Sequence, residues 1–437
     1  MRMPWKKIPF ADEISGNGGS SVTEEEGTPQ IADSLQLVST GLGRCYGLDI
    51  YGRYAYVASL AEGKLFVVDI KDPENLVKLG EVQCPAPTEE DCRWPIAMGK
   101  YVITEGYDPD DTPSLHTIDV SDPEEPEIVA YAPIRVGKRK IIRNKIIYAC
   151  DTYTLKIVDA SDPLRLEQIA SINPYGDYDV NCVDVRGEIA CVAGYYRFAV
   201  LDVSDPYSPE VISTLSDYTN FSDDIRDLKI VGRYVFLANY GENGDNVRIG
   251  ITAVDIKDPD NPSVVSRIDD TTILNGNWAL EASDRYAYVA SGRSNYFSII
   301  DISDPANMNI VSYVHDDTIL DNILACKLYG RYAIVASGDS GYVSSIKIGG
   351  YSIPNIRTQG LAAYRFVSEY GNIDKQLKAM DGTFHQLHAT KFYPTISRNS
   401  SEPTLEDGQM IIWHDTSNNK YYLMIRDKGA QKKVELT

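Results

Sequence analysis

Short runs of alternating apolar and polar residues recur between residues 35 and 350, and no helical period is sustained there. A first run, such as GRYAYVAS (52–59), is followed by a second that ends in Asp-x-x-Asp-Pro, such as LFVVDIKDP (65–73). The runs are rich in Val, Ile and Tyr, reach at most about eight residues and are bounded by Gly or Asp-Pro, which is typical of β-strands. The pattern therefore predicts an all-β chain.

Both runs are repeated along the chain. The first occurs seven times, at starts 43 to 52 residues apart, and a further short apolar-alternating run lies on either side of each pair. Four strands at this period are the signature of a β-propeller blade, so the sequence predicts seven blades. The second run occurs six times, as LFVVDIKDP (65–73), LHTIDVSDP (115–123), LKIVDASDP (155–163), FAVLDVSDP (198–206), ITAVDIKDP (251–259) and FSIIDISDP (297–305).

The two ends of the array predict how the ring closes. The seventh unit, GRYAIVAS (330–337) and YVSSIKIGGYS (342–352), lacks both Asp-Pro and a fourth strand. A run of the missing character, LQLVSTGL (35–42), precedes the first unit. We therefore expect the N-terminal strand to complete the last blade, because closure removes the open sheet edges.

These phrases resemble the LVIVD-repeat propellers, whose defining phrase appears here as LKIVD and LFVVD followed by SDP or KDP. The resemblance covers about residues 35–352. It implies the propeller fold and no catalytic residues. Proteins with these repeats are often bacterial or archaeal surface and extracellular proteins.

The repeated aspartates are predicted to make turns, because a catalytic pair is needed once and not six times. Proline fixes φ, and the preceding aspartate can accept hydrogen bonds from backbone amides of the turn. The earlier aspartate of each phrase ends the third strand. Metal binding at these turns is the alternative. The turn aspartates are Asp72, Asp122, Asp162, Asp205, Asp258 and Asp304.

Composition narrows the classes of partner. The 437 residues carry a formal net charge of −21, which argues against nucleic acid and anionic membrane surfaces. No stretch is apolar enough to span a bilayer, and the opening residues lack the apolar core of a secretory signal, so we expect synthesis in a reducing cytoplasm. Seven cysteines without paired spacing are predicted to be small core residues, and a Cys84–Cys92 pair is left open.

Two segments lie outside the predicted ring. Residues 1–34 contain a Gly, Ser and Glu stretch that is typical of an extended arm. Residues 353–437 are predicted to form a connector and a small β-meander, with strands at MIIWHD (410–415), KYYLMIRD (420–427) and KKVELT (432–437).

These terminal segments resemble tailed-phage virion structural proteins. The phrases are DGQMIIWHDT (407–416), NNKYYL (418–423), KKVEL (432–436) and, more weakly, the opening MPWKKIPFADEI (3–14). The resemblance implies a virion component, released by lysis without a signal peptide. Its partners would be other virion proteins, bound through residues 1–34 and 353–437, and it could form a homo-oligomer.

Few residues suggest chemistry. His385 and His388, with Asp381 nearby, have the spacing of two metal ligands on one helical turn but lack a third ligand. The acidic groups Asp108, Asp110, Asp111 and Asp217, Asp223, Asp224 lack the spacing of an EF-hand, which leaves solvated loops or weak Ca²⁺ binding. We therefore predict no cofactor and no transition metal.

Loop lengths predict where recognition occurs. The turns after first and third strands are short and uniform, whereas the loops after second and fourth strands, such as NYGENGDNVRI (239–249), are long and varied. Long loops on a rigid scaffold commonly carry binding residues. Aromatic rings there could stack on sugars or anchor a protein, or pack under their own loops. The candidates are Trp94, Tyr107, Tyr218, Phe221, Tyr240 and Trp278.

Three functional classes remain. The first is a non-enzymatic virion protein, associated with tail or capsid, whose propeller binds a host-surface glycan or protein. The second is a cellular surface or scaffold propeller that binds proteins or glycans. The third is a polysaccharide hydrolase or lyase using the channel carboxylates Asp49, Asp184, Asp227 and Glu281, although no proton-donating His or Tyr recurs beside them.

Overall fold

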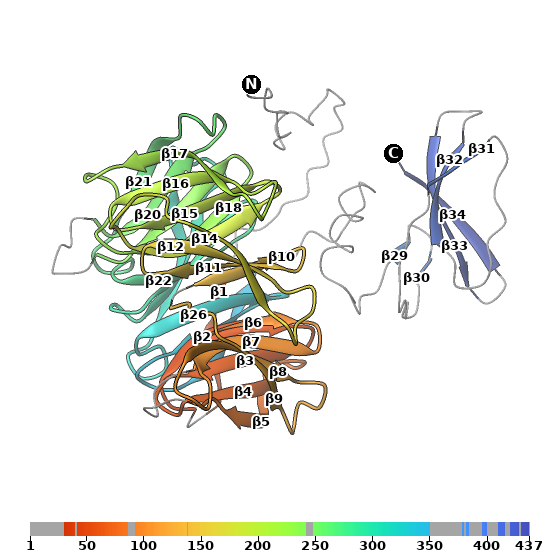
Figure 1. Cartoon of the computed structure of the whole chain (residues 1–437). Helices are drawn as coiled ribbons and strands as arrows, with labels where there is room; N and C mark the ends of the chain where they lie inside the picture. Colours follow the sequence, from red (N-terminus) through yellow and green to blue (C-terminus); the bar gives the residue numbers. More distant parts are fainter. Residues whose placement is uncertain are drawn as a thin grey trace. The chain divides into compact units, whose positions relative to one another are not determined.

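The protein is described by a computed structural model that covers residues 30–39, 42–85, 92–137, 139–241 and 248–349, together with six short strands between residues 378 and 436. The chain divides into two compact units, residues 1–351 and 352–437. In the first unit, seven four-stranded antiparallel sheets form a ring, which Figure 1 follows from red to cyan. The predicted seven-bladed propeller is confirmed, and the described residues contain no helix.

Each of the first six blades takes four consecutive strands. Blades 1 to 3 contain β2 (Cys45–Tyr51), β3 (Tyr54–Ser59), β4 (Lys64–Asp69) and β5 (Val77–Gln83); β6 (Arg93–Met98), β7 (Tyr101–Tyr107), β8 (Pro113–Asp119) and β9 (Glu127–Ala132); and β10 (Lys140–Arg143), β11 (Ile146–Asp151), β12 (Thr154–Asp159) and β13 (Glu167–Ile172). Blades 4 to 6 contain β14 (Val180–Arg186), β15 (Ile189–Gly194), β16 (Arg197–Asp202) and β17 (Glu210–Ser216); β18 (Ile225–Val231), β19 (Tyr234–Asn239), β20 (Gly250–Asp255) and β21 (Ser263–Ile268); and β22 (Asn277–Ala282), β23 (Tyr286–Ser291), β24 (Tyr296–Asp301) and β25 (Asn309–His315).

The seventh blade closes the ring with a strand from the other end of the array. Its order is β26 (Ile323–Tyr329), β27 (Tyr332–Ser337), β28 (Val343–Gly349) and β1 (Gln30–Ser39), with β1 antiparallel to β28. The predicted N-terminal closure is confirmed. The strand begins at Gln30 instead of residue 35, because pairing with β28 continues beyond a register shift between Ile31 and Leu35, where the apolar alternation is interrupted.

Polar contacts seal the seam between the seventh and first blades. The Glu74 carboxylate accepts a hydrogen bond from Tyr332 Oη (2.8 Å) and pairs with Lys347 Nζ (2.9 Å). Ser345 Oγ donates to the carbonyl of Pro73, in the Asp-Pro turn of the first blade. Side-chain contacts therefore join the last blade of the array to the first.

The hydrophobic core lies between blades. Side chains alternate across each sheet, so one face of a strand packs on the preceding blade and the other on the following blade. On β3, Ala55 and Val57 belong to the cluster shared with the seventh blade, whereas Tyr56 and Ala58 belong to the cluster shared with the second. Among the described residues there are seven such clusters, one for each blade interface. Each blade is thus buried on both faces.

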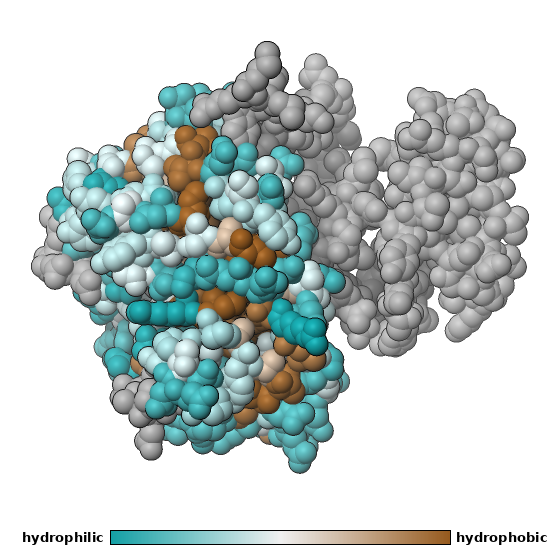
Figure 2. Space-filling view, in the orientation of Figure 1, coloured by the Kyte–Doolittle hydropathy of each residue, from teal (hydrophilic) through white to brown (hydrophobic). Residues whose placement is uncertain are grey.

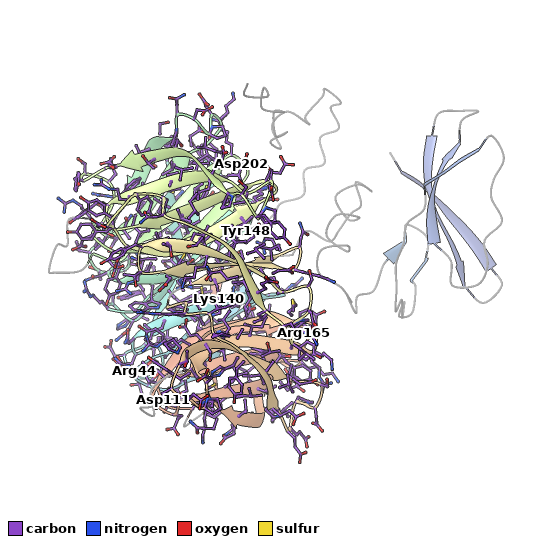
Figure 3. All side chains as sticks on the ribbon, viewed as in Figure 1. Arg44, Asp111, Lys140, Tyr148, Arg165 and Asp202 are labelled. Carbon is purple, nitrogen blue, oxygen red and sulfur yellow. The ribbon has the colours of Figure 1, made fainter. Side chains whose placement is uncertain are left out.

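The ring presents two different faces. The long-loop face carries the connections from second to third strands and from one blade to the next, and the short-turn face carries the remaining turns. Arg44 and Asp111 mark the long-loop face in Figure 3, and Asp202 and Arg165 the short-turn face. On the side of the ring that Figure 2 shows, hydrophilic residues cover most of the coloured surface, and apolar residues gather in a few patches between them.

Both aspartates of the repeated phrase accept backbone N–H bonds on the short-turn face. In the first blade, Asp69 Oδ1 accepts from Lys71 N (2.8 Å) and Asp72 Oδ1 from Glu74 N (3.1 Å). The remaining turn aspartates make the equivalent bond to the residue two positions on, namely Asp122, Asp162, Asp205, Asp258 and Asp304. The pairs therefore hold the turns.

The C-terminal unit is a small sheet in the described residues. The strands β32 (Met410–Asp415), β33 (Lys420–Asp427) and β34 (Ala430–Leu436) form the predicted antiparallel meander. A strand that the sequence did not predict, β31 (Ile396–Asn399), pairs parallel with β32, and β29 (Lys378–Ala379) pairs with β30 (Gly382–Thr383). Two parallel strands are not joined by a short hairpin turn, so no turn signal in the sequence indicated β31.

Several predictions concern residues outside the described part of the chain. They include most of the extended arm, the connector, and His385, His388 and Asp381. Within the described residues, no helix is long and apolar enough to cross a membrane.

Candidate functional site

The first strands of six blades carry a β-bulge where they begin, on the long-loop face. A bulge leaves one residue out of the ladder and redirects its side chain, and bulges are frequent beside functional sites. The bulged residues include Tyr46, Arg226 and Trp278, and Trp94 lies within the equivalent irregularity of β6. The register shifts fall between Cys45 and Gly47, Arg93 and Ile96, Val180 and Cys182, Ile225 and Asp227, Asn277 and Ala279, and Ile323 and Ala325.

Four aromatic rings converge there from blades 1, 2, 5 and 6. The Tyr46 ring meets Trp94 edge-on (centroids 5.4 Å apart) and Trp278 (5.8 Å), and Tyr240 meets Trp278 (5.2 Å). The first and sixth blades are not neighbours, so these contacts lie across the mouth of the central channel. Edge-to-face contact is a preferred geometry of aromatic pairs.

Four arginines cover these rings. A guanidinium over an aromatic face gains cation–π attraction, and arginine in particular stacks well. We call the eight residues the mouth cluster. The distances from Cζ to the ring centroid are 5.6 Å for Arg93 over Tyr46, 4.7 Å for Arg139 over Trp94, 4.3 Å for Arg226 over Trp278, and 4.2 Å for Arg293 over Tyr240.

Arg139 spans the channel. Its Nη1 lies 3.3 Å from Asp227 Oδ2, its Nε donates to the Arg226 carbonyl (2.8 Å), and its Nη2 donates to the Trp278 carbonyl. Arg139 precedes the third blade, whereas its partners belong to the fifth and sixth. Because both charged groups are largely buried, the pair ties three blades together beneath the aromatic rings.

A second charged layer lines the channel along blades 5, 6, 7 and 1. Glu281 Oε1 lies 2.9 Å from Lys327 Nζ and 3.4 Å from Lys229 Nζ, and Lys327 continues to Asp49 (3.6 Å). Burial opposes ionisation of Glu281, yet the two lysines lower its pKa to about 2. Although burial opposes its charge, Glu281 and Asp49 raise the pKa of Lys327. The charges therefore alternate around this part of the channel.

Three channel aspartates also join their blade to the one that follows. Asp49 Oδ2 accepts a hydrogen bond from Ala97 N (2.8 Å), Asp184 Oδ2 from Ile230 N (2.9 Å) and Asp227 Oδ2 from Leu280 N (2.9 Å). Asp184 also pairs with Arg143 (3.4 Å). Burial raises the pKa of Asp184 against the opposing effects of Lys229 and Arg143. The carboxylates considered as catalytic candidates thus have structural partners.

Replacing Glu281 with Gln is expected to change the response of the fold to acid. Folding lowers this pKa from 4.5 to about 2, so the carboxylate stabilises the fold above pH 4.5, and this stabilisation is lost as the pH falls through about 2. The free energy of unfolding, measured in urea, should differ less between the wild type and Glu281→Gln as the pH falls from 4.5 to about 2. The exposed Glu127→Gln serves as control, and a difference that stays constant would contradict the prediction.

The structure brings together three of the six aromatic candidates. Trp94, Tyr240 and Trp278 belong to the mouth cluster, where Trp278 keeps only 7% of its surface exposed. Phe221 is fully buried and packs in the core between blades 4 and 5. Its apolar ring gains more from this core than from the loop surface, so it is unavailable to a ligand.

The other two candidates lie elsewhere on the long-loop face. Tyr107 is half-buried at the end of β7, and its carbonyl lies 2.8 Å from Nε2 of buried His116, whose pKa burial lowers to about 4. Tyr218 is 53% exposed in the connection after β17 and contacts Tyr196.

Among the acidic candidates, Asp108 and Asp217 accept hydrogen bonds within their own loops. Asp108 Oδ1 accepts from Asp110 N (3.0 Å) and Thr112 N (2.9 Å), and Asp217 Oδ1 accepts from Thr219 N (2.7 Å). Asp224 pairs with Arg226. No group of three potential ligands that could hold a metal occurs within the described residues.

The cysteines are buried thiols. The Sγ atoms of Cys84 and Cys92, the pair that the sequence left open, lie 2.8 Å apart.

Sequence reasoning missed Tyr46 and the four arginines. Their signal was weak but present, since Arg93, Arg139 and Arg226 each stand at or beside the start of a first strand. An alignment of the repeated units would have shown that arginine recurs at or beside this position, and this recurrence could have indicated a charged channel mouth.

Three segments, residues 43–83, 179–217 and 277–316, match the LVIVD repeat. The chain carries LVIVD repeats. The segments coincide with blades 1, 4 and 6, and the predicted resemblance of the ring is thereby confirmed. No curated protein matches the chain.

Solved propellers resemble the structure at low identity. A putative 6-phosphogluconolactonase from Bacteroides uniformis shares 12% identity and a TM-score of 0.53, over 70% of this chain and 94% of that one. A periplasmic gluconolactonase from Pseudomonas aeruginosa shares 13% and 0.51, over 62% and 85%. A protein from Lactobacillus plantarum shares 13% and 0.51, over 67% and 87%. Such likeness shows the fold alone.

Proposed function

We propose that the protein is a non-enzymatic recognition propeller that binds a protein or glycan partner through its long-loop face. The mouth cluster carries this proposal, because bulges in the first strands direct rings and guanidinium groups to one place on that face. Aromatic residues and arginine are enriched where binding energy concentrates. Arg293 is its exposed member and lies over the half-buried ring of Tyr240.

The channel supports binding better than catalysis. Glycoside hydrolysis requires two carboxyl groups flanking the scissile bond, one of them able to donate a proton. Here Glu281 is held ionised by two lysines, and Asp49, Asp184 and Asp227 accept backbone hydrogen bonds. The gluconolactonases among the similar structures support the fold and not this activity.

We further propose that the protein is a virion component, held in the particle by residues 1–34 and 353–437. This rests on the terminal phrases that resemble tailed-phage structural proteins. Particle attachment and partner recognition would then occupy separate parts of the chain. A cellular surface or scaffold propeller remains the alternative, and the presence or absence of capsid and tail genes beside its gene distinguishes the two.

Replacing Tyr240 and Arg293 together with Ala is expected to lower binding to host envelope fractions immobilised on a sensor by about tenfold or more, because a stacked pair is removed from the mouth cluster. Trp278 is left in place because it is buried. The matched control, Tyr51→Ala with Tyr207→Ala, removes two exposed rings from the short-turn face and should bind as the wild type does.

Removing residues 353–437 should leave envelope binding unchanged and abolish incorporation of the protein into purified particles. Unchanged binding by the mouth variant would contradict the recognition proposal. Gluconolactone hydrolysis that Asp184→Asn abolishes would contradict the non-enzymatic one, and unaffected incorporation after truncation would contradict the attachment one.

A further inference from the structure

Blade 4 carries a group of exposed tyrosines that lies apart from the mouth cluster. Tyr178 precedes β14, Tyr195 and Tyr196 form the loop between β15 and β16, and Tyr218 follows β17. All three loops belong to the long-loop face. Together with Arg197, the first residue of β16, we call these residues the tyrosine cluster.

The five side chains form a closed circuit of contacts. Tyr178 stacks on Tyr195 (centroids 5.9 Å apart, interplanar angle 15°), Tyr195 meets Tyr196 (4.8 Å), and Tyr196 meets Tyr218 (5.0 Å). Arg197 completes the circuit, because its Cζ lies 4.3 Å from the Tyr178 centroid and 5.4 Å from that of Tyr218, and its Nη2 donates to Tyr218 Oη (3.0 Å). These contacts hold the rings in place before any ligand arrives.

The rings nevertheless remain open to solvent. Tyr178, Tyr195 and Tyr218 are 37%, 42% and 53% exposed, and none of them belongs to a blade-interface core. Rigid tyrosines provide apolar contact area and polar hydroxyl groups at little cost in side-chain entropy. The cluster is thus a preorganised amphipathic surface.

The loop between β15 and β16 is unusual for its geometry. It has two residues, and the second, Tyr196, has a φ of 51°. A turn whose second central residue has positive φ favours Gly or Asn at that position, because bulky residues are disfavoured in the left-handed region. Tyrosine at position 196 is therefore a poor choice for folding, and strained backbone of this kind gathers at functional sites. The side-chain contacts of the tyrosine cluster offset this cost and explain why tyrosine stands here.

We propose that the tyrosine cluster is a stacking platform for a neutral oligosaccharide. The apolar C–H face of a pyranose ring packs on an aromatic ring, while its hydroxyl groups bond to phenol and carboxylate oxygens at the edge. This inference deepens the proposed function of the long-loop face and depends on it.

Charge favours a neutral ligand over an acidic one. The Arg197 guanidinium already packs on two rings and donates to one of them, and Arg248 already packs over Tyr196 (Cζ 5.4 Å from the ring centroid). The exposed carboxylate of Asp177 lies beside Tyr178 in the chain. The net charge of −21 further disfavours a polyanion. A protein partner fits less well, because a stable interface takes roughly 20–30 residues on each side, whereas this platform consists of five side chains.

The decisive variant is Tyr195→Asn combined with Tyr196→Gly, since it removes two rings and places glycine at the position with positive φ. We expect its melting temperature to equal or exceed that of the wild type. The probes are cellohexaose, laminarihexaose and N-acetylchitohexaose, each titrated calorimetrically at millimolar concentration into the full-length protein. At least one should bind the wild type, and the variant should bind it about tenfold more weakly or worse.

Two further changes separate stacking from hydrogen bonding. Tyr218→Phe keeps the ring and should retain most of the affinity, whereas Tyr218→Ala should lose it. Tyr153→Ala is the matched control, because Tyr153 is 45% exposed in a two-residue hairpin loop on the same face and lies outside the cluster.

Several results would overturn the inference. They are no binding of any neutral hexasaccharide, equal binding by the Asn-Gly variant, or binding of polygalacturonate alone. A protein partner released by the Asn-Gly variant, without oligosaccharide binding, would also overturn it. Each of these leaves the recognition proposal standing as long as the Tyr240 and Arg293 variant loses envelope binding, so the two failures are distinguishable.

Discussion

Deleting residues 1–39 is expected to lower the melting temperature sharply and to make the protein aggregate. The deletion removes β1, so the seventh blade loses its outer strand and β28 becomes an unpaired edge. An exposed edge pairs with other chains. It also removes Ile31, which packs on the core between blades 6 and 7, and its backbone hydrogen bond to Ser312 Oγ (3.1 Å).

The matched control is a deletion of residues 1–29, which retains all of β1. We expect this shorter protein to melt as the full chain does and to elute as one species in size-exclusion chromatography. The comparison isolates the closing strand from the preceding segment. Equal melting temperatures and equal dispersity of the two deletions would show that β1 is not needed for closure.

Replacing Arg139 with Met should destabilise the propeller by about 3 kcal/mol, because the buried Asp227 carboxylate loses its charged partner. Three blades also lose the hydrogen bonds that this guanidinium makes to the Arg226 and Trp278 carbonyls. Arg139→Lys should recover only part of the loss, since an ammonium cannot reproduce the planar fork of donors. Thermal unfolding should show a decrease of about 4–5 °C for the Met variant.

Arg165→Met provides the control for this experiment, because Arg165 is exposed on the short-turn face (Figure 3). It should melt as the wild type does. A double-mutant cycle that combines Arg139→Met with Asp227→Asn measures the coupling free energy between the two charged groups. If Arg139→Met unfolded like Arg165→Met, Arg139 would not join the blades.

The blades could be predicted from the sequence because the residue patterns that specify them are local and repeated. Each Asp-x-x-Asp-Pro phrase fixes its own turn, and alternation along Tyr54–Ser59 or Tyr286–Ser291 identifies a strand without knowledge of its neighbours. Closure by β1 was predictable for the same reason, since one unit lacked a strand and another segment supplied it.

The mouth cluster could not be predicted in this way because it depends on distance in space alone. Tyr46 and Trp278 meet although most of the ring separates them in sequence. The bulges that direct them have no local signature in these strands. Similarly, Glu281 resembled a catalytic acid until Lys229 and Lys327 were found beside it. Phe221 stood among polar loop residues, and only the packing of blades 4 and 5 shows it to be core.

The bonds between blades have a consequence for how such a ring could change. Asp49, Asp184 and Asp227 each bond to a backbone N–H of the following blade. In the same direction, Thr117, Ser213, Ser266 and Ser345 donate to the carbonyl of the next Asp-Pro turn. In these seven bonds the group that the neighbour supplies is main chain, so it is present whatever side chains that neighbour carries. A unit could be duplicated, exchanged or moved along the gene without a matching substitution for these seven bonds, which frees the loops to diverge blade by blade.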